Sequence, residues 1–174
     1  MKYNYSDVYL TPKYSELRSR SEADVKVDFL GRSWNLPIVP ANMESVINVD
    51  LARQLSNTNN FYIMHRFGDT LEFVKLANQE NWEYISISVG VKQEDKDLLK
   101  TIFDTKLRVD CITIDVAHGH SILVKETLRY LYDTFTGLDM PPSIIAGNVT
   151  TPEAVVDLAG WGADAVKIGI AGGA

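Results

Sequence analysis

Six short apolar runs divide the chain, and each of them ends in small or polar residues. The run at 110–121 shows this form most clearly, because β-branched residues at 112–114 and 116 give way abruptly to Ala-His-Gly-His-Ser. Such a pattern is typical of a buried strand that ends in a functional turn. We therefore predict strands in all six runs, which span 36–43, 61–66, 84–91, 110–116, 143–149 and 165–170.

Amphipathic segments with a helical period lie between these runs and predict five helices. The first should run from about residue 46 to 55, Asp69 is placed to cap the second, and Thr151 with Pro152 starts the fifth. Residues 1–32 lack sustained periodicity and form a lead-in, with short strand patterns at 8–10 and 25–29. Strands that alternate with helices predict a parallel sheet with right-handed crossovers.

The regular succession of units favours a (β/α)₈ TIM barrel over a doubly wound sheet, because no glycine-rich phosphate loop follows the first strand. Such a barrel needs about eight units and about 250 residues, whereas the chain has 174. We expect an α/β chain with one partial TIM-barrel domain, in which 33–174 supply barrel units. The barrel should be incomplete, with about six strands and five helices.

Composition restricts the partners. The net charge is −6 and no Lys/Arg run is present, which argues against nucleic acid or an anionic membrane surface. No apolar stretch of roughly 18 residues and no signal segment is visible, so we expect a cytoplasmic protein. The single cysteine, Cys111, lies in an apolar strand and favours a reducing compartment; it should be a buried small residue rather than a reactive thiol.

In a barrel, the residues that follow each strand meet at one rim. Asp115 stands in an otherwise apolar strand, where an unpaired carboxylate is costly, so it either pairs with a cation such as Arg66 or Lys167 or reaches a ligand hydroxyl. Asn148 either caps the next helix or reads a base or ribose edge. The glycines at 169–173 either cradle a phosphate or cation or form a plain turn.

Two histidines, His118 and His120, lie close together on the same loop. They lack a carboxylate or thiolate at metal-ligand spacing, so helix capping or loop packing is favoured over a metal site.

Longer motifs run in a fixed order across almost the whole chain, at 5–10, 19–22, 36–43, 61–67, 85–92, 112–121, 145–155 and 162–170. In these segments the chain resembles the IMP dehydrogenase and GMP reductase family, and the reductases most closely, in particular a bacterial subgroup. The dehydrogenases usually carry a domain-sized insertion after the second strand, whereas here only a helix-length segment separates Arg66 from the third strand. The Ala41-Asn42-Met43 segment is also similar to the reductase form.

The resemblance implies a (β/α)₈ fold and the NADPH-dependent conversion of GMP to IMP and ammonia through a cysteine thiolate. It implies nucleotide contacts at Met43 and Asn148. It places Gly173 in a loop that approaches the nucleotide phosphate and holds a monovalent cation such as K⁺. On the cofactor side it implies a set of five residues: Arg66 beside Asp115, then Val116, Ala117 and Gly169.

The chain departs from the family in that loop. The family's loop usually reads glycine-x-glycine-serine, then one further residue, then the cysteine. Here the loop reads Ala171-Gly172-Gly173-Ala174, and both alanines weaken the cation and phosphate assignments. The nucleophile is expected just beyond Ala174, since Cys111 lies inside a strand. We therefore expect no turnover from the 174 residues alone.

Three functions stay open. The chain is the N-terminal part of a GMP reductase, completed by the missing C-terminal half of the barrel; or an IMP dehydrogenase relative; or a half-barrel that binds a purine nucleotide such as GMP or IMP without catalysis. The family's usual assembly implies a homo-oligomer, a tetramer.

Overall fold

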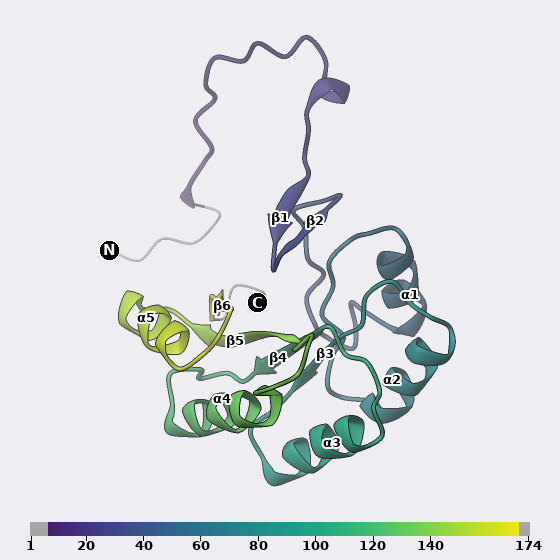
Figure 1. Ribbon diagram of the computed structural model, residues 1–174. Helices are drawn as coiled ribbons and strands as arrows, with labels where there is room; N and C mark the ends of the chain where they lie inside the picture. Colours follow the sequence, from purple (N-terminus) through teal and green to yellow (C-terminus); the bar gives the residue numbers. More distant parts are fainter. Residues whose placement is uncertain (1–6, 171–174) are drawn as a thin grey trace.

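The computed structural model describes residues 7–170, which form a mixed α/β fold (Figure 1). Four parallel strands make the central sheet in the order β3-β4-β5-β6: β3 (Ser86–Val89), β4 (Cys111–Asp115), β5 (Ser143–Val149) and β6 (Ala165–Ile168). Five helices lie around one side of the sheet: α1 (Val49–Asn57), α2 (Thr70–Gln79), α3 (Gln93–Asp104), α4 (Ile122–Phe135) and α5 (Pro152–Gly160). This is a partial barrel, as predicted, and the sheet does not close within the described residues.

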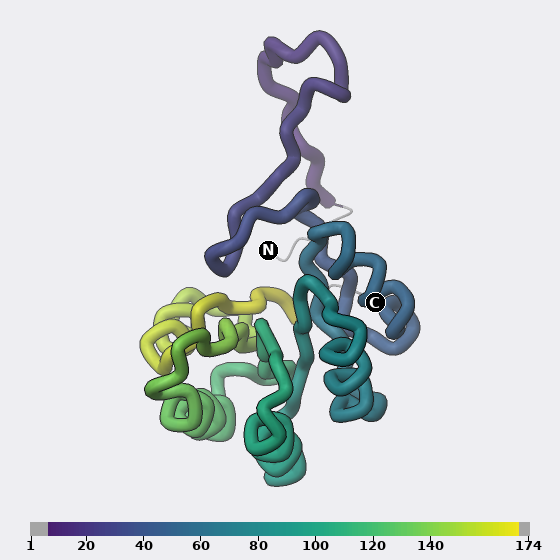
Figure 2. The backbone as a smooth tube through the Cα atoms, turned by 45° about the vertical axis from the view of Figure 1, so that its right-hand side comes forward, coloured from purple at the N-terminus to yellow at the C-terminus, as the bar shows by residue number. Residues whose placement is uncertain are grey.

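A small hairpin precedes the barrel units. β1 (Val27–Phe29) pairs with β2 (Arg32–Trp34) in antiparallel register. Leu30 and Gly31 form the turn with φ values of 51° and 71°, the pair of positive angles that a type I′ hairpin requires. The pattern at 25–29 is therefore confirmed in part, whereas the strand predicted at 8–10 is wrong, because those residues are exposed and irregular. Figure 2 shows this N-terminal arm projecting from the body.

Two of the six predicted barrel strands are not strands in the structure. Residues 36–43 form no ladder, since Pro37 and Pro40 lack the N–H groups that pairing requires. Residues 61–65 are buried beside β3, yet their links to it run largely through side chains. Tyr62 donates its hydroxyl to the Tyr84 carbonyl at 2.9 Å, and Ser88 Oγ donates to the Met64 carbonyl at 2.6 Å.

The helix starts follow their capping residues. Asp69 Oδ1 accepts from Glu72 N at 3.0 Å, and Thr151 Oγ1 accepts from Ala154 N at 3.2 Å, so both predicted caps are confirmed. The first helix begins at Val49 instead of about 46, because Asn48 is its cap. At the other end of the chain, β6 stops at Ile168, two residues short of the predicted strand. None of the helices within residues 7–170 is long and apolar enough to cross a membrane.

The core lies between the sheet and the helices and extends beneath the hairpin. All of β3 and all of β4 except Asp115 are buried, including Ile87, Ile112 and Ile114. At the N-terminal end of the sheet, Trp34 packs edge-on against Phe61 and Tyr84, with ring centroids 5.3 and 4.7 Å away. The opposite, C-terminal end of the strands presents the polar residues described next.

Candidate functional site

Three residues lie side by side across the carboxyl ends of three strands. Asp115 on β4 is in register with Gly147 on β5, and Gly147 is in register with Lys167 on β6. The Lys167 ammonium donates to Asp115 Oδ1 at 3.0 Å. Gly147 makes this possible, because a Cβ there would lie 2.6 Å from the Lys167 carbonyl oxygen and 2.7 Å from its Cβ. The ion pair therefore spans the middle strand over a position without a side chain.

Asn42 joins this row from a distant part of the sequence. Its Oδ1 accepts a second hydrogen bond from the Lys167 ammonium at 2.5 Å. The residue is only 6% exposed, and its Nδ2 is buried without a hydrogen-bond partner among the described residues. A buried amide donor without an acceptor costs roughly 1–3 kcal/mol, so this group is poised to meet a ligand or another protein group.

Asn148 interrupts the pairing of β5 with β6. The register shifts between Gly147 and Val149, which makes a bulge at Asn148, and bulges commonly re-aim a side chain next to an active site. Its Nδ2 donates to the Gly169 carbonyl at 2.9 Å, while its Oδ1 is buried without a partner among residues 7–170. Asn148 N also donates to the Val116 carbonyl at 2.8 Å. The ends of β4, β5 and β6 are thus tied together around an amide oxygen that has no partner.

The loop after β4 needs a glycine at position 119. Gly119 N donates to the Asn148 carbonyl at 2.8 Å, and a Cβ at this position would lie 2.9 Å from that oxygen. The neighbouring His120 is hydrogen-bonded through Nε2 to Asp157 Oδ2 at 2.8 Å and stacks on Trp161. This is the loop packing predicted for His120, whereas His118 is exposed. No group of three or more metal-ligating side chains occurs in the described part of the chain.

The predicted cofactor residues are brought together only in part. Asp115, Val116 and Ala117 leave β4 at the rim, with Ala117 exposed, and Gly169 follows β6 with a φ of 123°. Arg66 lies elsewhere: its guanidinium covers the Phe67 ring at 4.9 Å. Of the two cations considered for Asp115, the structure therefore selects Lys167.

On the predicted substrate side, Met43 is 52% exposed and adjoins Asn42, whereas Gly173 lies outside the described residues. Asn42 itself was missed as a site residue. The available signal was an amide at the end of an apolar run, on the same predicted rim as Lys167.

Cys111 is fully buried, as predicted. Burial raises the pKa of its thiol to about 12, while the neighbouring Ser86, Tyr84 and Thr113 side chains act to lower it. A thiol that stays protonated at neutral pH and cannot be reached from solvent is a poor nucleophile.

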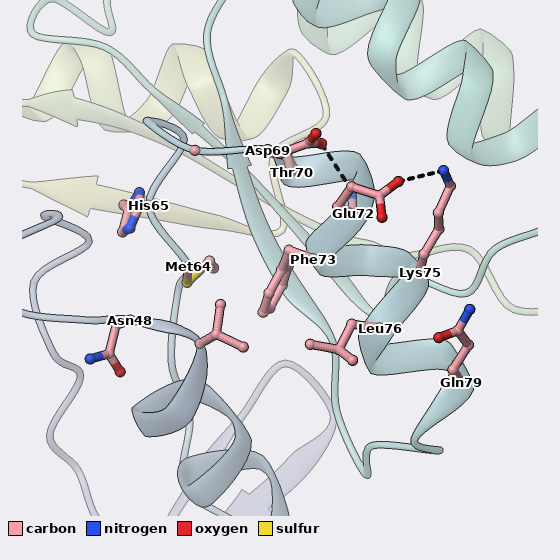
Figure 3. Close-up of a pocket in the computed structure, with 12 residues that line it drawn as sticks. Asn48, Met64, His65, Asp69, Thr70, Glu72, Phe73, Lys75, Leu76 and Gln79 are labelled. Atoms are coloured by element: carbon pink, nitrogen blue, oxygen red, sulfur yellow. Dashed lines mark hydrogen bonds and ion pairs between the residues drawn. The ribbon is translucent and has the colours of Figure 1, made fainter.

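Two cavities bear on binding. One of about 510 Å³ opens between α1 and α2, where Met64, His65 and Phe73 line it (Figure 3). His65 Nδ1 accepts from Phe67 N at 3.2 Å. The other, of about 230 Å³, lies inside the curve of the sheet and has apolar walls except for Asn42 and Lys167. The second cavity is therefore the one that adjoins the polar row.

Comparison with known proteins gives a consistent result. The family described as IMP dehydrogenase / GMP reductase domain matches residues 2–174. A GMP reductase from Paracidovorax citrulli (strain AAC00-1) is 42% identical over 173 residues, which cover 98% of this chain and 51% of that protein. GMP reductases from Mesoplasma florum, 42% identical, and Delftia acidovorans, 43% identical, also match 98% of this chain, with 52% and 51% of their own lengths covered.

The chain spans about half the length of the curated relatives it matches. Because the match extends over nearly all of its residues, the chain belongs to the IMP dehydrogenase / GMP reductase family.

Proposed function

We propose that the chain is the N-terminal part of a GMP reductase, which converts GMP to IMP and ammonia with NADPH. The observation that carries this proposal is the polar row at the carboxyl ends of β4, β5 and β6, where Asn42 Nδ2 and Asn148 Oδ1 are buried without a partner among the described residues. Active sites of TIM barrels lie at this end of the strands. The relatives named GMP reductase support the same reaction.

On the substrate side, Met43 and Asn148 would contact the nucleotide. The Asn148 amide oxygen accepts hydrogen bonds, and the edge of a purine carries N–H donors, so its lack of a partner fits this role. Gly173 would lie in the loop that approaches the phosphate and holds a monovalent cation, with K⁺ as the candidate.

On the cofactor side, Asp115, Val116, Ala117 and Gly169 would line the binding surface. Arg66 would join them by turning its guanidinium away from Phe67. NADPH supplies a hydride when bound. The exposed Ala117 and the glycine at 169 leave backbone accessible for a close approach. The Asp115 carboxylate is held in place by Lys167 and can accept a ligand hydroxyl with its other oxygen.

The thiol nucleophile would come from the other half of the barrel, because Cys111 is buried and its pKa is raised. In this arrangement 1–32 form the lead-in and 33–174 the barrel units of one domain. Exposed apolar residues at the open edge of the sheet, Ile168 and Ile170, fit burial against that half. We also propose a cytoplasmic homo-oligomer, the tetramer typical of the family.

The test is to produce the chain together with the C-terminal half of the Delftia acidovorans GMP reductase and to follow NADPH absorbance after adding GMP. We expect oxidation that depends on GMP and on both halves. The matched controls omit GMP, omit one half, or offer IMP with NAD⁺.

Reduction of NAD⁺ with IMP, without oxidation of NADPH, would assign the dehydrogenase direction instead. GMP binding measured by calorimetry, without turnover from the joined halves, would favour a non-catalytic nucleotide-binding module.

A further inference from the structure

The Lys167 ammonium connects two parts of the rim that the sequence keeps far apart. It donates to Asn42 Oδ1 at 2.5 Å and to Asp115 Oδ1 at 3.0 Å. Asn42 directly precedes Met43, on the proposed substrate side, while Asp115 directly precedes Val116, on the proposed cofactor side. A single charged group therefore holds the residue that precedes each side of the proposed site.

We infer that Lys167 is a positioning residue that couples the nucleotide side of the site to the cofactor side. This inference rests on the proposed function. It assigns a role to the Asn42–Lys167–Asp115 contacts and to Gly147, over which the lysine side chain passes.

The chemistry of the group supports this role. An ammonium has three N–H donors and here uses two of them on protein oxygens, so one is left for a ligand acceptor. Asn42 Nδ2 adds a second free donor, and this residue is only 6% exposed. Both residues line the cavity of about 230 Å³, whose remaining walls are apolar. An acceptor placed in this cavity would lie beside Asn42 and Lys167.

The link between Asn42 and Asp115 also depends on a cationic side chain at position 167. Lys167 is half-buried, and its side chain and that of Asp115 are 30% and 20% exposed. Ion pairs that are partly removed from water constrain geometry more than exposed pairs do. Arg66, which lies over Phe67, does not make the same link.

The first experiment uses the ¹⁵N-labelled chain without ligand. We expect Lys167→Met to shift the backbone amide signals of both Met43 and Val116, because the lysine contacts the residue that precedes each of them. Lys100→Met is the matched control, because Lys100 pairs with Asp104 on an exposed face of α3 and should change neither signal. A shift confined to one side, or to neither, would overturn the inference.

The second experiment measures kinetics of the joined halves. Lys167→Met should raise KM for both GMP and NADPH by about tenfold, a loss of binding rather than of kcat alone. Lys167→Arg, which keeps the charge, should recover most of the affinity. Asn42→Ala, which keeps the ion pair, should raise KM for GMP while leaving that for NADPH within about twofold.

These variants separate a positioning role from a structural one. If Lys167→Met does not fold, Asn42→Ala still tests the link, and equal KM values for wild type and Asn42→Ala would overturn the inference. A lower unfolding midpoint with both KM values unchanged would do the same. If the wild-type halves do not oxidise NADPH with GMP, the proposed function fails, and the amide shifts of Met43 and Val116 decide whether Lys167 links the two sides.

Discussion

The two ends of the four-stranded sheet are built from different kinds of contact. At the N-terminal end, the Trp34 ring is 1% exposed, and its Nε1 donates to the Phe29 carbonyl at 3.0 Å. Asp110 Oδ2 accepts from Ile85 N, and Asp164 Oδ2 accepts from Ile144 N, both at 2.7 Å, so carboxylates satisfy backbone donors where strands begin. At the C-terminal end, the Asn42 and Asn148 side chains each keep a buried polar atom without a partner.

Aromatic packing and paired carboxylates mark the N-terminal end and unpaired amide atoms the C-terminal end, although Asn60 Oδ1 and Ser86 Oγ at the N-terminal end also lack a partner among the described residues. Burying aromatic surface and pairing polar groups lowers the free energy of the fold, whereas an unpaired buried amide raises it. A protein keeps such a cost where a ligand repays it, and strained or unsatisfied groups gather at functional sites. Substitutions at the two ends should therefore affect different measurements.

The largest effect on stability is expected for Trp34→Ala at the N-terminal end of the sheet, here called the closed end because aromatic rings fill it. Removing this ring empties the space between Phe61 and Tyr84, and truncation of a buried aromatic costs about 3–5 kcal/mol of unfolding free energy. Denaturant titration of the chain measures this loss. The control is Tyr132→Ala on α4, where the side chain is 64% exposed and a change below about 0.5 kcal/mol is expected. Equal effects for the two rings would remove the distinction between the ends.

Gly147→Ala should have the next largest effect on stability. This residue lies at the C-terminal end of the sheet, here called the open end. The added Cβ would meet the Lys167 backbone oxygen at 2.6 Å, so β5 and β6 must separate, at a cost of about 1–3 kcal/mol. Gly160→Ala is the matched control, because no atom lies within 4 Å of a Cβ there and the residue ends α5. Unfolding midpoints that move equally in both variants would argue against the close approach at Gly147.

The sequence predicted the elements whose signal is local. Thr151 with Pro152 located α5, Asp69 located α2, and the run at 110–116 located β4, because a cap or an uninterrupted apolar run carries its own information. Residues 36–43 misled, since their apolar content resembles a strand while two prolines remove the donors. Residues 61–65 misled because serine and tyrosine side chains take much of the place of a ladder, which depends on tertiary neighbours.

The candidate site divides in the same way. Asp115 was recognisable as a charged residue in an apolar strand, and Lys167 and Arg66 were both available as partners. The choice of Lys167 depends on strand register and on the missing side chain at Gly147, neither of which can be obtained from sequence spacing. The unpaired atoms Asn42 Nδ2 and Asn148 Oδ1 emerge only when the surrounding atoms are placed.

Stability at alkaline pH should test whether water reaches the buried Cys111 thiol. The unfolded chain loses the Cys111 proton near pH ~8.5, whereas the folded chain keeps it until a pKa of about 12. Unfolding free energy should therefore fall between these values, by up to about 1.4 kcal/mol per pH unit from this thiol. Burial also raises the pKa of Tyr62 and Tyr84, so the comparison is best made below about pH 10.

Cys111→Ala is the control for that pH titration, measured by denaturant unfolding at each pH. It should be less stable at neutral pH because of the cavity it leaves, and its stability should change less steeply with pH. Parallel pH profiles for wild type and Cys111→Ala would mean that water reaches the thiol.

The smallest change in stability is expected for Asn148→Ala, and it sharpens the comparison most. The substitution removes one hydrogen bond to the Gly169 carbonyl, and it also removes a buried oxygen that had no partner. These effects oppose each other, so unfolding free energy should change by less than about 1 kcal/mol. The joined halves should nevertheless lose about tenfold or more in GMP affinity, measured by calorimetry.

Asn78→Ala provides the opposite case at the closed end. Asn78 donates to the Val74 and Arg108 carbonyls at 2.8 and 3.0 Å and accepts from Arg108 N at 2.9 Å, so its amide is paired on both sides. Its loss should cost about 1–3 kcal/mol of unfolding free energy while GMP affinity stays unchanged. If Asn148→Ala were the more destabilising of the two and bound GMP as wild type does, the open end of the sheet would serve stability, and the assignment of the site to that end would be wrong.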